Sequence, residues 1–320
     1  MRIGIDIMGG DYAPQKTVHG AILALNELPK DTTVVLFGKA SQILAELKQH
    51  SVRPDKFEII DCSEVIDMGE HPTKAFKSKP NSSIAKGFKY LALGKIDGFS
   101  SAGNTGAMFV GGFYSVKAIE GILRPVISTL IPRNDGGVTV LLDVGANADC
   151  KPDVLYQFGI LGSLFSEHVC GIKKPNVSLL NLGEEKTKGN MLTQATYSMM
   201  ENNADYHFTG NIEGRDIFDS ESDVIVCDGF TGNIVLKEAE GIFSIMEKRG
   251  LLDDYFKRFN YEKYGGTPIL GLNKTVIIGH GISNEIAIKN MITLTKDVVE
   301  ADLASKIKHN LNEWEKLMLQ

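Results

Sequence analysis

Ser101-Ala102-Gly103-Asn104-Thr105-Gly106-Ala107 is the stretch that decides the fold, because an apolar run, a glycine-rich turn and a helical pattern follow one another there. Glycine lets a backbone approach a ligand closely, and the first N–H groups of a helix have no partner within it. Such a turn can bind an anion without lysine or arginine in the turn itself. The stretch therefore predicts an α/β fold with an anion site at the ends of its strands.

Four further runs repeat this arrangement. They are Asp6-Ile7-Met8-Gly9-Gly10-Asp11, Leu142-Asp143-Val144-Gly145-Ala146-Asn147, Asp228-Gly229-Phe230-Thr231-Gly232-Asn233 and His280-Gly281-Ile282-Ser283. Each follows an apolar, β-rich stretch, and most lead into a helical pattern. Because ligands of parallel sheets lie beyond the carboxyl ends of the strands, we expect the five runs to line one cleft for phosphate or a developing oxyanion.

Strand and helix patterns alternate along the chain. Strands are expected at 3–7, 33–37, 57–61, 98–101, 126–131, 138–144, 177–182, 224–227 and 275–278, and helices over 15–28, 41–50, 82–93, 105–119, 153–169, 190–202 and 232–247. The longest irregular segments are 67–81 and 249–267, and residues 297–319 show an amphipathic stripe ending in Trp314 and Met318. This alternation favours a parallel or mixed sheet covered on both faces. We expect one domain over residues 1–320, which could form two lobes around a cleft.

The composition narrows the functional class. The net charge is −6, which argues against bulk nucleic-acid binding. None of the four cysteines forms a Cys-x-x-Cys pair, and Cys62 and Cys227 fall in apolar runs, so buried free thiols are expected. No run approaches the ~20 apolar residues of a membrane span. The first strand begins directly, so a cytoplasmic protein is expected.

Several catalytic motifs are missing from the sequence. It has no P-loop, no Gly-x-Gly-x-x-Gly after the first strand, no Gly-x-Ser-x-Gly and no His-Glu-x-x-His. The glycine-rich turns at the strand ends instead suit electrostatic stabilisation of an anion. Two other classes stay open: a nicotinamide-dependent hydroxyacid dehydrogenase and a non-catalytic module that binds an anion or a carrier protein.

Four basic residues could meet an anion. Arg124 and Arg133 bracket an apolar strand, where a structural salt bridge and a ligand contact are equally compatible with the pattern. Lys188 is favoured as a functional cation because Gly189-Asn190 follows it, whereas Lys186 is interpreted as a solvated neighbour. For His280, a structural role is the first interpretation and proton handling the second.

Ordered blocks along nearly the whole chain resemble the PlsX family, the phosphate acyltransferases of bacterial phospholipid synthesis. Besides the five runs, these blocks are Ala13-Pro14, Arg124-Pro125, Asn181–Glu185 with Lys188-Gly189-Asn190, Gly210-Asn211-Ile212-Glu213-Gly214 and Tyr264-Gly265-Gly266. The resemblance implies a three-layer α/β/α sandwich with a mostly parallel sheet, like the isocitrate and isopropylmalate dehydrogenases and the phosphotransacetylases.

The resemblance also implies a reaction. Inorganic phosphate attacks the thioester of a long-chain acyl-acyl carrier protein, which gives an acyl phosphate for phospholipid synthesis. The implied partners are acyl carrier protein, a second copy of the chain in a homodimer, and a membrane glycerol-3-phosphate acyltransferase of the PlsY type. No nucleic acid, metal or cofactor is expected.

The expected site residues follow from the same blocks. Catalytic roles are expected for Lys188, Asn104, Thr105 and Asn233. Contacts with phosphate or substrate are expected from Asp6, Gly9, Gly10, Asp11, Ser101, Gly103, Gly106, Asn147, Asn211, Thr231, Gly232, His280 and Ser283. Within that set the acidic residues and Asn147, together with Asp143, are expected chiefly to shape the loops.

Two departures from the family pattern matter. Tyr12 stands where family members commonly have His, so no proton transfer is assigned there. The segment 249–264 is shorter than in related chains, where it forms a hairpin implicated in membrane contact. We therefore expect only weak peripheral contact with the inner face of the membrane.

Overall fold

The computed structural model describes the backbone of residues 1–318 and the side chains of residues 1–311. By its internal contacts the chain divides into two compact units. Unit 1 comprises Met1–Lys117 and Tyr261–Asp302, and unit 2 comprises Ala118–Asn260 and Leu303–Gln320. The single cleft expected from the sequence stays a prediction.

Unit 1 is built on the strand order β3-β2-β1-β4-β11-β10. The first five strands are parallel, and β10 is antiparallel to β11. Their bounds are β1 Arg2–Asp6, β2 Thr33–Gly38, β3 Glu58–Asp61, β4 Gly98–Ser101, β10 Thr267–Leu270 and β11 Thr275–Ile278. Val34, Val35, Leu36 and Phe37 are fully buried, as expected for a parallel strand covered on both faces. The loops after β1, β4 and β11 therefore share one edge of this sheet.

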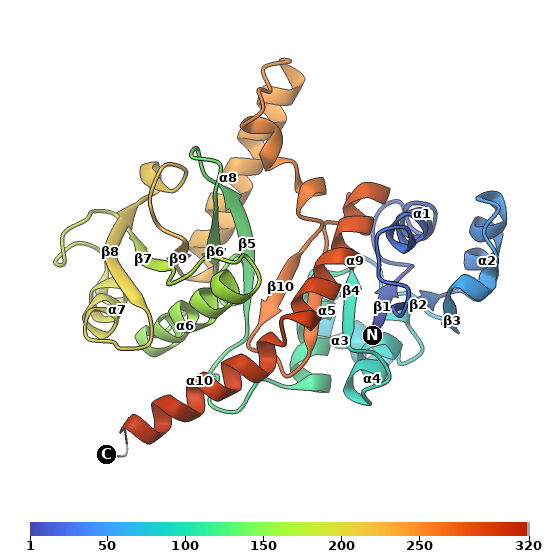
Figure 1. Cartoon of the computed structure of the whole chain (residues 1–320), viewed down its shortest axis with the longest axis horizontal. Coiled ribbons are helices and arrows are strands. Elements are labelled where there is room, and N and C mark those ends of the chain that lie inside the picture. The colour runs from blue at the N-terminus through green and yellow to red at the C-terminus, as the bar shows by residue number, and fades with distance from the viewer. Residues whose placement is uncertain (319–320) are drawn as a thin grey trace. The chain divides into compact units, whose positions relative to one another are not determined.

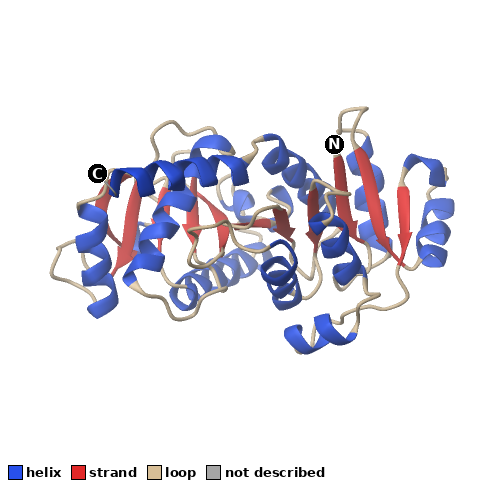
Figure 2. Cartoon of the chain, turned by 90° about the horizontal axis from the view of Figure 1, so that it is seen from below, coloured by secondary structure: helices blue, strands red, loops and turns tan. Residues whose placement is uncertain are grey.

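Helices cover both faces of the sheet of unit 1, as Figure 2 shows. They are α1 Gln15–Leu25, α2 Ala40–Gln49, α3 Pro72–Ser78, α4 Ser83–Ala92, α5 Thr105–Gly111 with a π-turn at Gly112–Val116, and α9 Glu285–Glu300. α9 packs against α1 and the central strands, whereas α4 packs with α5 and the same strands from the other face. α1, α5 and α9 each follow a glycine-rich loop at the carboxyl edge of this sheet, after β1, β4 and β11 respectively.

Unit 2 repeats this construction with the strand order β5-β6-β9-β7-β8, visible in Figure 1. β6, β9, β7 and β8 are parallel, and β5 is antiparallel to β6. The strands are β5 Val126–Pro132, β6 Val138–Leu142, β7 Asn176–Asn181, β8 His207–Glu213 and β9 Val224–Val226, and the helices are α6 Pro152–His168, α7 Met191–Glu201, α8 Gly229–Lys248 and α10 Leu303–Met318. α6 packs with α7 and α10, whereas α8 contacts β6.

The expected α/β class with a mostly parallel sheet flanked by helices is confirmed, and all nine expected strands are present within two residues of their bounds. β8 and β10 were missed. β8 contains Gly210 at φ +102°, beside a register shift against β7, which breaks its period-two pattern. β10 contains a proline, Pro268, which is unusual within a strand.

One predicted irregular segment and two predicted helices need correction. The segment 67–81 contains α3, and the helix expected over 105–119 ends after α5 and the π-turn at Val116. The single helix expected over 297–319 is the end of α9 and the whole of α10, separated at Asp302, where φ is +47°. The buried side of α10 includes Leu303, Ile307 and Leu311. The side chains of Trp314 and Met318, and the whole of Leu319, lie outside the described residues.

Among the described residues, every helix is too short or too polar to traverse a lipid bilayer.

Candidate functional site

The first cluster of loops lies at the carboxyl edge of unit 1 and is organised by the carboxylate of Asp6. Asp6 is 1% exposed, and its oxygens accept hydrogen bonds from the N–H of Met8 at 2.9 Å and from Oγ of Ser101 at 2.7 Å. Ser101 Oγ also accepts from the N–H of Gly103 at 2.9 Å. Gly9 lies so close that a Cβ there would be 2.5 Å from Oδ2 of Asp6. Burial raises the pKa of Asp6 above its usual range, although these hydrogen bonds oppose the shift.

Asn104 holds a second segment in place. Its Oδ1 accepts the N–H of Ala107 at 2.9 Å and caps α5. Its Nδ2 donates to the backbone oxygens of Asp67, Met68 and Glu70 at 3.0–3.1 Å. Asn104 is 4% exposed, so its amide faces these protein groups rather than solvent. The geometry gives Asn104 a positioning role for the loop 67–70.

The remaining expected residues of unit 1 border the same edge. The N–H of Asp11 donates to the backbone oxygen of Gly281 at 2.7 Å, which joins the loops after β1 and β11. Gly10 has φ +105°, a conformation that favours glycine. The ring of His280 packs on Tyr261 with centroids 5.4 Å apart, and Ser283 is 3% exposed. Thr105 is exposed at the start of α5, and Gly106 follows it against Pro72.

The second cluster lies at the carboxyl edge of unit 2 and is organised by Asp143. This fully buried carboxylate accepts hydrogen bonds from the N–H groups of Gly145, Ala146 and Asn147 at 3.2, 3.0 and 2.6 Å, and from Nδ2 of Asn147 at 2.8 Å. Burial raises the pKa of Asp143, and its N–H donors oppose the shift. A Cβ on Gly232 would be 2.0 Å from the backbone oxygen of Asp143. Only glycine therefore lets the start of α8 lie against the loop after β6.

The start of α8 already carries an acidic cap. Asp228 accepts from the N–H of Thr231 at 2.8 Å and from its Oγ1 at 3.0 Å. The N–H of Gly229 donates to the backbone oxygen of Asn147, and that of Gly232 donates to the backbone oxygen of Asp228. The side chain of Asn233, by contrast, is exposed. Most donors of this helix start are thus satisfied within the protein, and a carboxylate lies beside them.

Lys186 and Lys188 differ in their surroundings. Lys186 forms an ion pair with Glu201 and lies 5.8 Å from the ring centroid of Tyr197, and the pKa of Lys186 is raised by that carboxylate. Lys188 is exposed, and no acidic group within the described part of the chain pairs with its ammonium group. Its aliphatic stem passes over Gly183, where a Cβ would be 2.9 Å from Cγ of Lys188. Lys188 is therefore the cation of this loop whose charge is available to bind an anion.

Two asparagines fix the loop that carries Lys188. Asn181, at the end of β7, donates from Nδ2 to the backbone oxygen of Lys188 at 3.2 Å. Asn211 on β8 donates to the backbone oxygen of Glu185 at 3.1 Å. Gly189 has φ +97°, which turns the chain into α7. The conformation of the loop is thus set by neighbouring strands.

A cavity of about 350 Å³ opens beside this loop, entirely within unit 2. It lies between the ends of β7 and β9 and the first turns of α6, α7 and α8. Its apolar wall is formed by Leu155, Leu179, Leu180, Leu182, Cys227 and Val235, and its remaining lining residues are Asn181, Asn190, Thr193, Gly214, Asp228 and Thr231. Sequence reasoning missed it because its walls come from segments that are distant along the chain.

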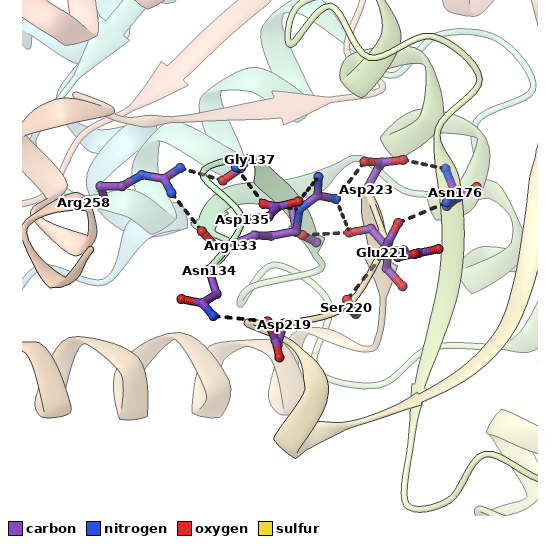
Figure 3. A network of polar contacts seen from close by, with 12 residues as sticks. Arg133, Asn134, Asp135, Gly137, Asn176, Asp219, Ser220, Glu221, Asp223 and Arg258 are labelled. Carbon is purple, nitrogen blue, oxygen red and sulfur yellow. Dashed lines mark hydrogen bonds and ion pairs between the residues drawn. The ribbon is translucent and has the colours of Figure 1, made fainter. Parts of the chain in front are cut away.

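Arg133 has a structural role. Its guanidinium forms ion pairs with Asp223 and Asp135 (Figure 3). The distances are 2.9 Å to Oδ1 of Asp223 and 3.2 Å to Oδ2 of Asp135. Asp223 also accepts the N–H of Asn176 at the start of β7, and Arg258 donates to the backbone oxygens of Arg133 and Gly137. This network lies at the amino ends of β7 and β9, away from the edge that carries Lys188. The structure thus decides between the two interpretations of Arg133 in favour of a salt bridge.

All four cysteines are free, and Cys62 and Cys227 are buried as expected. Burial raises the pKa of Cys62, Cys150 and Cys170 to about 12. A thiol with so high a pKa is a poor nucleophile. Within residues 1–311, no three His, Cys, Asp or Glu side chains gather in a way that could hold a metal ion.

Residues 1–306 match the family described as fatty acid synthesis protein. The chain is 43% identical to a phosphate acyltransferase of Dictyoglomus thermophilum, with 98% of each chain covered, and 42% identical to one of Halothermothrix orenii, with 98% and 99% covered. Its fold is similar to that of a phosphotransacetylase from Streptococcus pyogenes, with a TM-score of 0.68 over 94% of each chain at 18% identity.

Proposed function

We propose that this chain, which belongs to the PlsX family of phosphate acyltransferases, transfers a long-chain acyl group from acyl carrier protein to inorganic phosphate. An oxygen of phosphate attacks the thioester carbonyl carbon and gives a tetrahedral oxyanion. The oxyanion collapses, the carbon–sulfur bond breaks, and the carrier leaves as a thiolate that takes a proton. The products are an acyl phosphate and the free carrier.

The observation that carries this proposal is that one loop carries Lys188, a cation with no acidic partner among the described residues, and also lines an apolar cavity through Asn181, Leu182 and Asn190. Phosphate is an anion, and the attacked carbonyl oxygen becomes one, so a fixed positive charge stabilises the transition state more than the ground state. The acyl group is apolar and needs a dry surface. The loop 181–190 supports the proposal because it carries the cation and borders the apolar cavity.

The other expected residues receive roles that suit their surroundings. We assign Asp6, Asp143 and Asn147 to loop geometry, because their side chains are engaged with the backbone, and Asp11 because its N–H joins two loops through the backbone oxygen of Gly281. The exposed Thr105 and Asn233 stay candidates for direct contact with an anion. Asn104 supports the site indirectly through the loop 67–70.

Partners follow from the reaction. Acyl phosphates react readily with water, so we propose that a membrane glycerol-3-phosphate acyltransferase consumes the product. The resemblance to the PlsX family supports a homodimer as the active form. Weak, salt-sensitive contact with a lipid surface is proposed at the segment 249–264, where Leu251 is 49% exposed and the basic Lys257 is exposed as well. Co-sedimentation with anionic liposomes at low salt tests this contact. Binding that persists at high salt, or none at low salt, would contradict it.

Turnover is the decisive experiment. Purified protein with hexadecanoyl-acyl carrier protein and phosphate should form hexadecanoyl phosphate and free carrier without added nucleotide. Release of carrier at the same rate without phosphate would identify a thioesterase. Absence of any turnover would favour a binding module, and reduction of NAD by a hydroxyacid would favour the dehydrogenase.

A further inference from the structure

We propose that the cavity beside Lys188 receives the acyl chain of the thioester, an inference that rests on the proposed function. The cavity has about 350 Å³, within the range of roughly 300–1,000 Å³ that is usual for small-ligand pockets. It opens where β7 leads to α7 and β9 leads to α8. Figure 1 shows these two helices on opposite sides of the sheet of unit 2. Such a switch point between neighbouring parallel strands is where open α/β sheets bind their ligands.

The bottom of the cavity is apolar. Leu155 and Leu179 are 1% and 0% exposed, and Leu180 is 8% exposed. They come from α6 and from the end of β7, so the wall is supported by the core of unit 2. A rigid apolar wall of this kind favours a hydrocarbon chain over a charged group.

Several polar groups of the lining are engaged in hydrogen bonds within the protein. Thr231 donates its hydroxyl to Asp228, and Thr193 donates its hydroxyl to the backbone oxygen of Asn190 at 3.2 Å. Oδ1 of Asn181 accepts the N–H of Leu182 at 2.9 Å. With these hydroxyls engaged and the Asp228 carboxylate in the wall, the cavity disfavours phosphate as its occupant and favours a neutral, apolar chain.

The mouth of the cavity suits a chain whose reactive end stays outside. Leu182 lines the cavity yet is 71% exposed, and Met191, next to the lining residue Asn190, is 90% exposed. Asn181 lines the cavity and also holds the backbone of Lys188. A chain that enters past Leu182 would leave its carbonyl group beside the loop that carries Lys188.

Val235 and Ile234 provide a matched pair for the test. Both lie on α8, but Val235 lines the cavity whereas Ile234 is 52% exposed and does not. Val235→Phe should fill part of the cavity, and Ile234→Phe adds similar bulk outside it. The displaced part of the chain should amount to at least two methylenes, which corresponds to about a tenfold loss of binding.

The first readout is binding, because it does not require turnover. A neutral, fluorescent hexadecanoyl amide should bind the wild-type protein and Ile234→Phe alike, and Val235→Phe about tenfold more weakly. The second readout is the ratio of kcat/KM for hexadecanoyl- and butanoyl-acyl carrier protein. Val235→Phe should lower this ratio about tenfold, because the long chain loses more contact with the cavity than the short one.

Equal losses with both chain lengths would place the carrier's pantetheine arm in the cavity and overturn the proposal. Equal effects of the two Phe variants, or unchanged binding in Val235→Phe, would overturn it as well. If Val235→Phe fails to fold by circular dichroism, Leu182→Gln replaces it and must weaken binding of the amide. Wild-type protein that binds the amide but forms no acyl phosphate would refute the proposed function while leaving the cavity assignment standing.

Discussion

Replacement of Lys188 by alanine removes the cation that has no acidic partner among the described residues of its loop. Because the backbone of the loop is held by Asn181 and Asn211, the change should leave the loop in place. The exposed side chain contributes little packing, so the fold should persist. The expected loss is therefore electrostatic and confined to the reaction.

The size of the loss follows from Coulomb's law. A unit charge ~4 Å from another contributes ~1 kcal/mol in water and ~4 kcal/mol at the effective dielectric constant of a protein surface. Lys188 is exposed, so the lower part of this range applies. We expect a loss of at least ~1.4 kcal/mol, which is about a tenfold fall in kcat/KM.

The assay is steady-state formation of acyl phosphate, with thermal unfolding of each variant measured in parallel. Lys186→Ala is the control, because its ammonium group is already paired with Glu201. It should change turnover little. Normal turnover in Lys188→Ala, or loss of turnover only through unfolding, would remove Lys188 from the site.

Three further predictions concern the interior. Asn104→Ala should destabilise the protein by about 2–4 kcal/mol, from a lost helix cap and unsatisfied backbone oxygens, whereas the exposed Thr105→Ala should have little effect on urea unfolding. A stable Asn104→Ala variant would contradict this role. Treatment with iodoacetamide at pH 8 should leave activity unchanged, because burial raises the pKa of Cys150 and Cys170 to about 12. Rapid inactivation would show a reactive thiol. The pKa of Asp6 is raised in the folded state, so the folded protein keeps the proton of the Asp6 carboxyl to a higher pH than the unfolded protein does. The free energy of unfolding should therefore fall as pH rises from near 3.8 through the folded pKa. Asp6→Asn should reduce this slope in urea titrations, and an identical slope in both proteins would refute the assignment.

Local patterns in the sequence were sufficient to predict most of the fold. Buried parallel strands appear as continuous apolar runs, and glycine-rich turns mark their carboxyl ends. Where a local pattern was broken, the prediction failed: Gly210 interrupts β8, and Asp302 separates α9 from α10. The family and its reaction class were also accessible, because ordered blocks of sequence carry them.

The roles of individual side chains required the tertiary structure. Lys186 and Lys188 are two residues apart in the same loop, and only the position of Glu201 on α7 distinguishes the paired cation from the unpaired one. Arg133 is engaged by Asp223, 90 positions away along the chain. The cavity takes its walls from three helices and the ends of three strands. Sequence determined the elements because hydrophobic periodicity and turn chemistry act over a few neighbouring residues. The structure decided the site because charge pairing and cavity shape depend on residues that only folding brings together.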